Sequence, residues 1–195
     1  MQKKISVIVA HPNPKSFNHA IAGQAAATLR QLGHAVFYHD LYREKFDPLF
    51  GVGELQSSGP IPRAIGLYCR EALESDGFVV VHPNWWAQPP AVLKGWVDRV
   101  LRQGLAYRFT DEGKVVGLLK APTAVVFNTA NTPEEAEREM FGDPLDGLWK
   151  KCIFEFCGVK NVHREVYRPV IVSSAIQRAQ WLASAREVVA ACFPA

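Results

Sequence analysis

The residues best suited to chemistry lie in a turn near the N-terminus. His11, Ser16 and Asn18 stand between an apolar run, Ile5 to Ala10, and an amphipathic segment that begins near Phe17. The first N–H groups of a helix have no partner within that helix, and the helix dipole adds partial positive charge at the same end. With imidazole, hydroxyl and amide donors beside these N–H groups, the turn is suited to bind a phosphate.

The residues of this turn leave two interpretations open. Ser16 can be an ordinary N-cap that accepts a hydrogen bond from a first-turn N–H, or it can form part of a phosphate site; we weight the two equally. The strand is not followed by G-x-G-x-x-G, and the chain contains no G-x-x-x-x-G-K-[ST]. The sequence therefore argues against a dinucleotide-binding Rossmann turn and against a nucleotide triphosphatase.

Two later loops carry aromatic and polar residues directly after apolar runs. The first comprises Pro83, Asn84, Trp85, Trp86 and Ala87, and the second comprises Asn128, Thr129, Ala130 and Asn131. An indole can face a planar ligand, and a hydroxyl or an amide can hydrogen-bond the rim of a heterocycle. The alternatives are core packing, favoured about two to one for either tryptophan alone, and, for the second loop, turn residues that lead into a helix.

Strand-length apolar runs alternate with helical patterns along the chain, which predicts an α/β fold with a parallel sheet and helices on both faces. The expected strands are 5–10, 35–39, 77–82, 123–128 and 162–172, and the expected helices are 17–32, 62–75, 90–101, 134–139, 145–157 and 173–192. Ligands bind at the carboxyl ends of the strands in such sheets. The loops after the first, third and fourth expected strands should therefore meet at one edge.

Composition limits the class of protein. Of the 195 residues 48% are hydrophobic and none forms a linker, so we expect a single domain over residues 1–195. A net charge of only +3, from scattered Lys and Arg, disfavours nucleic acid as a partner. The four cysteines lack C-x-x-C spacing, which predicts free thiols, a reducing compartment and no metal site. The apolar run at the N-terminus is too short for a signal peptide or a membrane span, so we expect a cytoplasmic protein.

Taken together, these motifs resemble the NAD(P)H:quinone oxidoreductase family, whose flavodoxin-like members include bacterial quinone reductases and ancillary subunits of potassium efflux systems. The resemblance extends over nearly the whole chain. Its motifs are H-P-x-x-x-S-F-N at 11–18, D-L-Y at 40–42, F-D-P at 46–48, P-A-V-L-K-G-W-V-D-R-V at 90–100, A-Y at 106–107, G-D at 142–143 and F-C-G at 156–158.

The resemblance implies a five-stranded flavodoxin-like domain that transfers a hydride from NAD(P)H through a flavin to a quinone or a related acceptor. The flavin implied is FAD, because the S-F-N form is typical of FAD-binding members, with FMN as the alternative. By matching position, His11, Ser16, Phe17 and Asn18 would hold the flavin phosphate. The ring would be bordered by Pro83, Asn84, Trp85, Trp86 and Ala87 and would receive contacts from Asn128, Thr129, Ala130 and Asn131.

The chain also departs from the family pattern. Ala130 and Asn131 stand where several members have two glycines, and Phe141 stands where the animal enzymes carry a histidine that helps to manage charge on the reduced flavin. The resemblance therefore does not carry over a proton relay through position 141.

Competing functions and partners follow from the same residues. A flavin-binding regulatory subunit that contacts a membrane transporter is the alternative function, whereas a flavodoxin-type electron carrier is disfavoured by the positive net charge. The apolar segment 90–101 and the aromatic residues Tyr107 and Phe109 also predict a homodimer.

Overall fold

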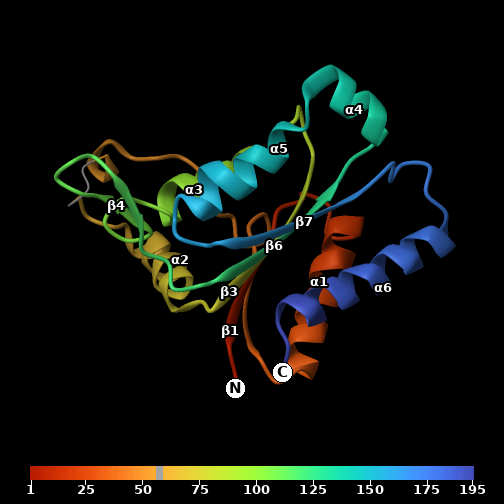
Figure 1. Cartoon of the computed structure of the whole chain (residues 1–195), viewed down its shortest axis with the longest axis horizontal. Helices are drawn as coiled ribbons and strands as arrows, with labels where there is room; N and C mark the ends of the chain where they lie inside the picture. The colour runs from red at the N-terminus through yellow and green to blue at the C-terminus, as the bar shows by residue number, and fades with distance from the viewer. Residues whose placement is uncertain (56–58) are drawn as a thin grey trace.

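A five-stranded parallel sheet forms the centre of the molecule in the computed structural model, which describes residues 1–55 and 59–195. The strands lie in the order β2-β1-β3-β6-β7 (Figure 1), so the predicted flavodoxin-like α/β fold is confirmed. Their bounds are β1 Lys4–Val9, β2 Ala35–Asp40, β3 Gly77–Pro83, β6 Thr123–Thr129 and β7 Asn161–Tyr167.

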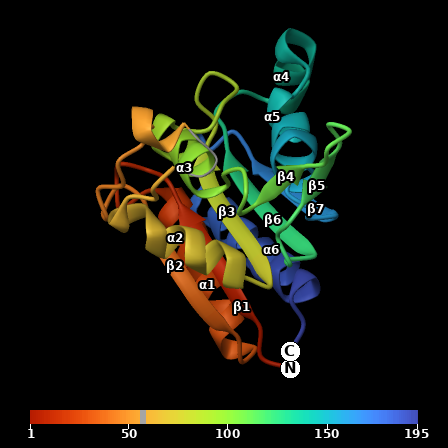
Figure 2. The ribbon, with the colours of Figure 1, turned by 90° about the vertical axis from the view of Figure 1, so that its left-hand side faces the viewer.

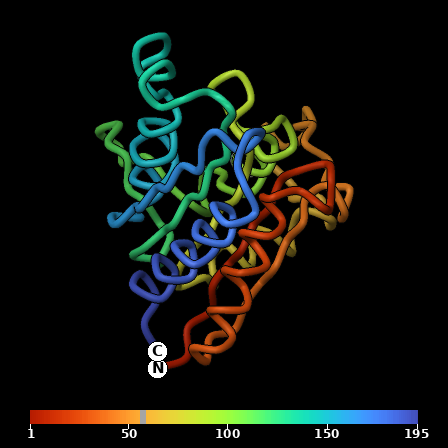
Figure 3. The backbone as a smooth tube through the Cα atoms, turned by 90° about the vertical axis from the view of Figure 1, so that its right-hand side faces the viewer, coloured from red at the N-terminus to blue at the C-terminus, as the bar shows by residue number. Residues whose placement is uncertain are grey.

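Helices cover both faces of this sheet (Figure 2). One face carries α1 (Phe17–Gln31) and α6 (Ala175–Cys192), which run side by side in Figure 3. The other face carries α2 (Arg63–Glu74), α3 (Ala91–Val100), the short α5 (Pro144–Gly147) and the π-helical segment η2 (Leu148–Glu155) that continues from α5.

The alternation of side chains along each strand divides the core into two layers. Val79 packs toward α1 and α6, whereas its neighbour Val80 packs toward α2 and α3. The same alternation places successive residues of every strand on opposite faces. This alternation therefore decides which side chains at the carboxyl ends of the strands lie on the same face of the sheet.

The first helix begins and ends where its sequence predicts. Ser16 is its N-cap and accepts a hydrogen bond from the N–H of His19. Gly33 follows its C-terminus with φ +85°, a conformation that residues with a Cβ rarely adopt. Ser16 is thus an N-cap, as one of its two interpretations predicts. Its hydrogen bond occupies the N–H of His19 and leaves the N–H groups of Phe17 and Asn18 for a ligand.

Four features differ from the expectation. A two-stranded antiparallel hairpin, β4 (Tyr107–Phe109) with β5 (Val115–Gly117), is added beside the main sheet. The last strand ends at Tyr167 and not at residue 172, because Pro169 has no N–H to continue the ladder. The helix expected at 134–139 extends to Phe141 as α4 (Glu134–Phe141), and a 3-10 turn, η1 (Val52–Glu54), precedes α2. None of the helices within residues 1–55 and 59–195 is long and apolar enough to cross a bilayer.

Candidate functional site

The loops after β1, β3 and β6 meet at the carboxyl edge of the sheet. Asn18 Nδ2 donates a hydrogen bond of 2.9 Å to Thr129 Oγ1, which joins the first loop to the third. The rings of His11 and Trp85, with centroids 6.1 Å apart, join the first loop to the second. The structure therefore brings together segments that are separated by up to 111 residues.

The start of α1 forms one end of this site. The first hydrogen bond along the helix axis runs from Ala20 N–H to Ser16 O, so the N–H groups of Phe17 and Asn18 precede the helical ladder. A cavity of about 490 Å³ reaches the first turn of α1 at His19 and is further lined by His11, Pro12, Pro14, Asp40, Tyr42 and Arg43. An anion at this end of the site would meet backbone donors and the positive end of the helix dipole.

A second cavity, of about 290 Å³, lies between the loops after β3 and β6. Its walls are Asn84, Trp86, Ala87, Ala130, Asn131, Thr132, Glu137 and Phe141. Trp86 is not a core residue, since its exposed fraction is 99%, and Trp85 is 40% exposed. These dimensions and the aromatic wall suit a planar heterocycle.

The second loop is a tight turn in an unusual backbone conformation. Trp85 and Gln88 exchange two backbone hydrogen bonds of 3.0 Å, and between them Trp86 and Ala87 have φ of +55° and +56°. Two successive left-handed residues are typical of a turn that normally holds Asn-Gly. The turn displays the Trp86 indole at the mouth of the second cavity.

Several of the predicted ligand residues lie differently from the expectation. The side chain of Asn128 is fully buried: its Nδ2 donates to His82 Nε2 at 2.6 Å and its Oδ1 accepts from Arg164 Nε at 2.6 Å. The predicted ring contact of this side chain is therefore wrong. Asn128 faces the layer of α3 and η2 because it alternates with Thr129 along β6.

Three further predicted residues contribute less than their side chains suggested. The Phe17 ring packs on Trp181 at 5.7 Å, so only its N–H group remains for a phosphate. Pro83 is buried within β3, where its carbonyl accepts from His82 Nδ1. The carboxamide of Asn18 is 97% buried and engaged with Thr129, which leaves its N–H as its main contribution.

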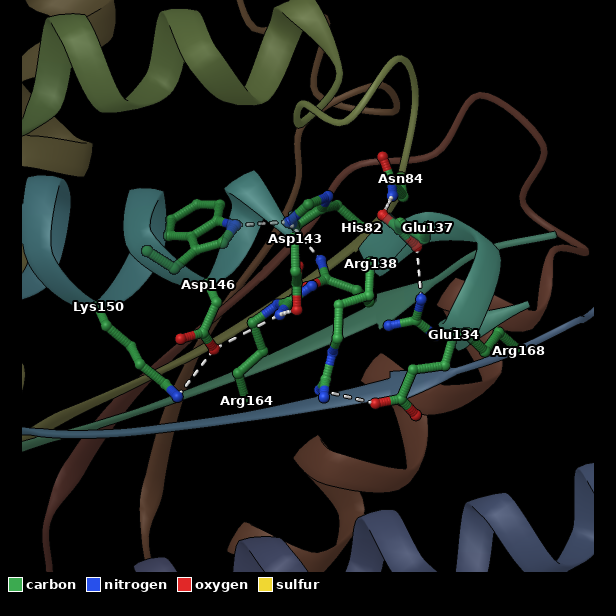
Figure 4. Close-up of polar contacts among 12 residues, drawn as sticks. His82, Asn84, Glu134, Glu137, Arg138, Asp143, Asp146, Lys150, Arg164 and Arg168 are labelled. Atoms are coloured by element: carbon green, nitrogen blue, oxygen red, sulfur yellow. Dashed lines mark hydrogen bonds and ion pairs between the residues drawn. The ribbon is translucent and has the colours of Figure 1, made fainter. Parts of the chain in front are cut away.

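A buried polar network around His82 lies at the carboxyl ends of β3 and β6 (Figure 4). His82 Nε2 accepts hydrogen bonds from Trp149 Nε1 at 2.8 Å and from Asn128, while its Nδ1 donates to the Pro83 carbonyl. Burial lowers the pKa of His82 to about 3, so its imidazole is neutral. Sequence analysis missed this histidine because it reads as the last residue of an apolar strand.

Two ion pairs tie the middle of α4 and the residue just beyond its end to β7 and to the segment that follows β7 (Figure 4). Arg164 Nη1 donates to Asp143 Oδ2 at 2.8 Å, and Arg168 Nη1 donates to Glu137 Oε2. Burial is the largest single influence on Asp143 and opposes its ionisation, but the hydrogen bond from Arg164 and the positive charges of Arg164, Arg168 and Arg138 together outweigh it and lower the pKa of that carboxyl. Arg164 and Arg168 are four residues apart in the expected strand 162–172. Because side chains alternate along a strand, this spacing places both arginines on one face.

Glu137 connects α4 to the ligand loops. It is only 2% exposed, its Oε1 accepts from Asn84 Nδ2, and it lines the second cavity. A charge this deeply buried requires a partner, which Arg168 supplies. Glu137 thereby holds a residue of the β3 loop in place while carrying no exposed charge into the cavity.

Known proteins with the same fold match nearly the whole of this chain. The family described as having a flavodoxin-like fold matches residues 3–191. The chain belongs to this family. An uncharacterised NAD(P)H oxidoreductase of Haemophilus influenzae is 38% identical over 168 residues, which cover 83% of this chain and 81% of the relative.

Relatives named as quinone reductases share this family. Ribosyldihydronicotinamide dehydrogenase [quinone] of Mus musculus is 31% identical over 207 residues, with 93% of this chain and 88% of the relative covered. The solved NAD(P)H:quinone oxidoreductase of Methanothermobacter marburgensis superposes with a TM-score of 0.84 at 26% identity and covers 97% of this chain and 96% of that structure. The resemblance to the quinone oxidoreductase family is thus confirmed over the length of the chain.

Proposed function

We propose that this protein is a flavin-dependent NAD(P)H:quinone oxidoreductase that transfers a hydride in one two-electron step. The observation that carries the proposal is the pair of cavities at the carboxyl edge of the sheet, one beside the start of α1 and one walled by Trp86, Asn131 and Phe141. Relatives over most of the chain are named as NAD(P)H and quinone oxidoreductases.

The donor set of the site fits a flavin phosphate and ring. The free N–H groups of Phe17 and Asn18 would hold the phosphate, while Asn84, Trp86 and Asn131 would border the ring. When bound, the flavin supplies the hydride chemistry, and the protein supplies binding and orientation.

The residues around the second cavity also define how charge is managed there. Phe141 is 54% exposed and presents no donor or positive charge. The side-chain amide of Asn131 lines this cavity, and its N–H donors are suited to stabilise negative charge that develops on reduction. We propose that the final protons come from water.

For the flavin itself we propose FMN. A relative from Clostridium beijerinckii, 34% identical over 100 residues that cover 49% of this chain, is named an FMN-dependent NADH:quinone oxidoreductase. This name counts against the expectation of FAD. The cavity beside α1 nevertheless has room beyond a single phosphate, so the mass of the cofactor released from the purified protein is the deciding measurement.

Turnover tests the proposed activity. With bound flavin, purified protein should oxidise NADH or NADPH in the presence of a soluble quinone, and the flavin absorbance should bleach on addition of the reduced nucleotide alone. Flavin binding without turnover, together with co-purification of a membrane transporter, would favour the regulatory subunit instead. A protein that binds no flavin would contradict both functions.

We propose that two copies of the chain form the working unit. A cavity of about 520 Å³ separates η1 from β4, and apolar side chains around it are open to solvent, with Val52 85% and Leu55 73% exposed. Tyr107 lines this cavity, and the ring of Phe109 packs against the ring of Tyr107. Exposed apolar side chains of this kind support the proposal of a homodimer. Light scattering should give twice the mass of the chain, and a monomer with active flavin would contradict this proposal.

A further inference from the structure

A continuous chain of hydrogen bonds links the N-cap of α1 to the end of β2. Ser16 Oγ lies 2.9 Å from His19 Nδ1, and His19 Nε2 lies 2.9 Å from Asp40 Oδ2. The side chains of His19 and Asp40 are only 13% and 11% exposed. His19 and Asp40 both line the cavity beside the start of α1, where the phosphate would bind.

The direction of these bonds depends on the charge of His19. A carboxylate only accepts hydrogen bonds, so Asp40 requires a proton on His19 Nε2. In neutral His19 the Nδ1 atom is then bare and takes the hydroxyl hydrogen of Ser16. In protonated His19 the Nδ1–H donates to Ser16 Oγ, so the O–H of Ser16 no longer points to His19 and can donate to another acceptor.

The other groups that face His19 do not compensate for this change. Burial lowers the pKa of His11 in the preceding loop and raises the pKa of Tyr42 in the turn after β2, so both are uncharged near neutral pH. Asp40 and Arg43 carry the fixed charges of the cavity, and Arg43 N–H donates to Asp40 Oδ1. His19 is therefore the group whose protonation alters the charge of this cavity.

We propose that His19 takes up a proton when a flavin phosphate binds at the start of α1, so that the Ser16 hydroxyl turns from His19 to the phosphate. His19 is a positioning residue in this scheme, and Asp40 fixes the orientation of its ring. The inference rests on the proposed flavin function, since the phosphate is that of the flavin. It adds proton-linked control of cofactor affinity by a residue that does not touch the flavin ring.

The linkage has a definite sign. Because the bound state holds more protons than the free state, affinity for FMN rises as the pH falls, by up to about tenfold per pH unit for one linked proton. Riboflavin, which has no phosphate, should show none of it.

Calorimetric titration of the flavin-free protein tests the proposal directly. FMN is titrated at pH 7.5 in buffers of different ionisation enthalpy, for wild type, for His19→Gln and for the control His163→Gln, which alters an exposed histidine on β7. On binding FMN, wild type and the control should each take up more protons than His19→Gln does. The difference should be a fraction of a proton and at most one. Titration of the FMN phosphate, with a second pKa of about 6, is common to all variants and cancels in the difference.

Several outcomes separate the two proposals. Equal proton uptake in wild type and His19→Gln, with FMN bound by both, overturns the role of His19 and leaves the flavin function intact. Failure of wild type to bind FMN at any pH overturns both. If His19→Gln does not fold, nitrogen NMR of wild-type histidines decides: addition of FMN, but not of riboflavin, should convert one imidazole from the neutral to the doubly protonated form, and no conversion contradicts the proposal.

Discussion

At the scale of single residues, the turn between β3 and α3 concentrates strain at the site. Trp86 and Ala87 both occupy the left-handed region, where a residue with a Cβ costs about 1–2 kcal/mol relative to the right-handed region. Strain of this kind persists where the surroundings determine the backbone, as the paired hydrogen bonds between Trp85 and Gln88 do here. The result is an indole held fully in solvent at the mouth of the second cavity.

Ala87→Gly should stabilise the protein. Glycine adopts φ of +56° without steric cost, so we expect a gain of about 0.5–1 kcal/mol after its larger loss of backbone entropy is subtracted. The measurement is urea unfolding followed by circular dichroism. Ala183→Gly, inside α6, is the matched control and should destabilise by about 1 kcal/mol. A loss of stability in Ala87→Gly would show that the methyl group makes contacts that outweigh the strain.

At the scale of elements, α4 stands away from the body of the molecule (Figure 1) and depends on buried ion pairs. Glu137 reaches Arg168 from the middle of the helix, and Asp143 reaches Arg164 just after its end. Arg164 lies in β7 and Arg168 directly follows it, so this strand and the residue after it hold α4 at Glu137 and just beyond the helix at Asp143. Glu134 and Arg138 of the same helix form an exposed ion pair.

Glu137→Ala should release this helix. It leaves Arg168 buried without a partner, at a cost of about 3–5 kcal/mol, whereas Glu134→Ala removes an exposed pair on the same helix worth less than about 1 kcal/mol. Hydrogen exchange by mass spectrometry should show loss of protection across α4 in Glu137→Ala and little change in Glu134→Ala. Equal protection in the two variants would mean that packing alone holds α4.

At the scale of the whole molecule, His82 joins three elements that are distant in sequence. From the end of β3 its ring bonds to Asn128 at the end of β6 and to Trp149 of η2. Every one of these atoms is buried, so the site edge of the sheet is coupled to the helical layer beneath it. The neutrality of this imidazole links the stability of the entire fold to pH.

Stability should fall in acid because of His82. Its folded-state pKa of about 3 lies below the unfolded value, so the unfolded chain binds a proton below a pH of about 6.5 while the folded chain does not. Between that pH and about 3 the group costs up to about 1.4 kcal/mol per pH unit. His82→Gln should lose less stability than wild type between pH 7 and pH 5 in urea unfolding, whereas the exposed-site control His163→Gln should parallel wild type. Parallel profiles for all three proteins would contradict this assignment.

The sequence by itself determined the architecture and the edge where ligands bind. Local periodicity specifies strands and helices, because a strand or helix buries one face through residues that lie close together in the chain. Parallel topology then places the loops that begin at His11, Pro83 and Asn128 at one edge. Motif spacing was enough to assign the family, since spacing is a property of the chain alone.

Only the tertiary structure decided which side chains face the site. The amide of Asn128 and the hydroxyl of Thr129 are adjacent in sequence. Asn128 nevertheless enters the buried network around His82, whereas Thr129 bonds to Asn18. The pairing of Glu137 with Arg168 and of His19 with Asp40 also escaped sequence analysis. The physical reason is that hydrogen bonds and ion pairs form between groups brought together by packing, and a single sequence records the type of each group but not the partner across space.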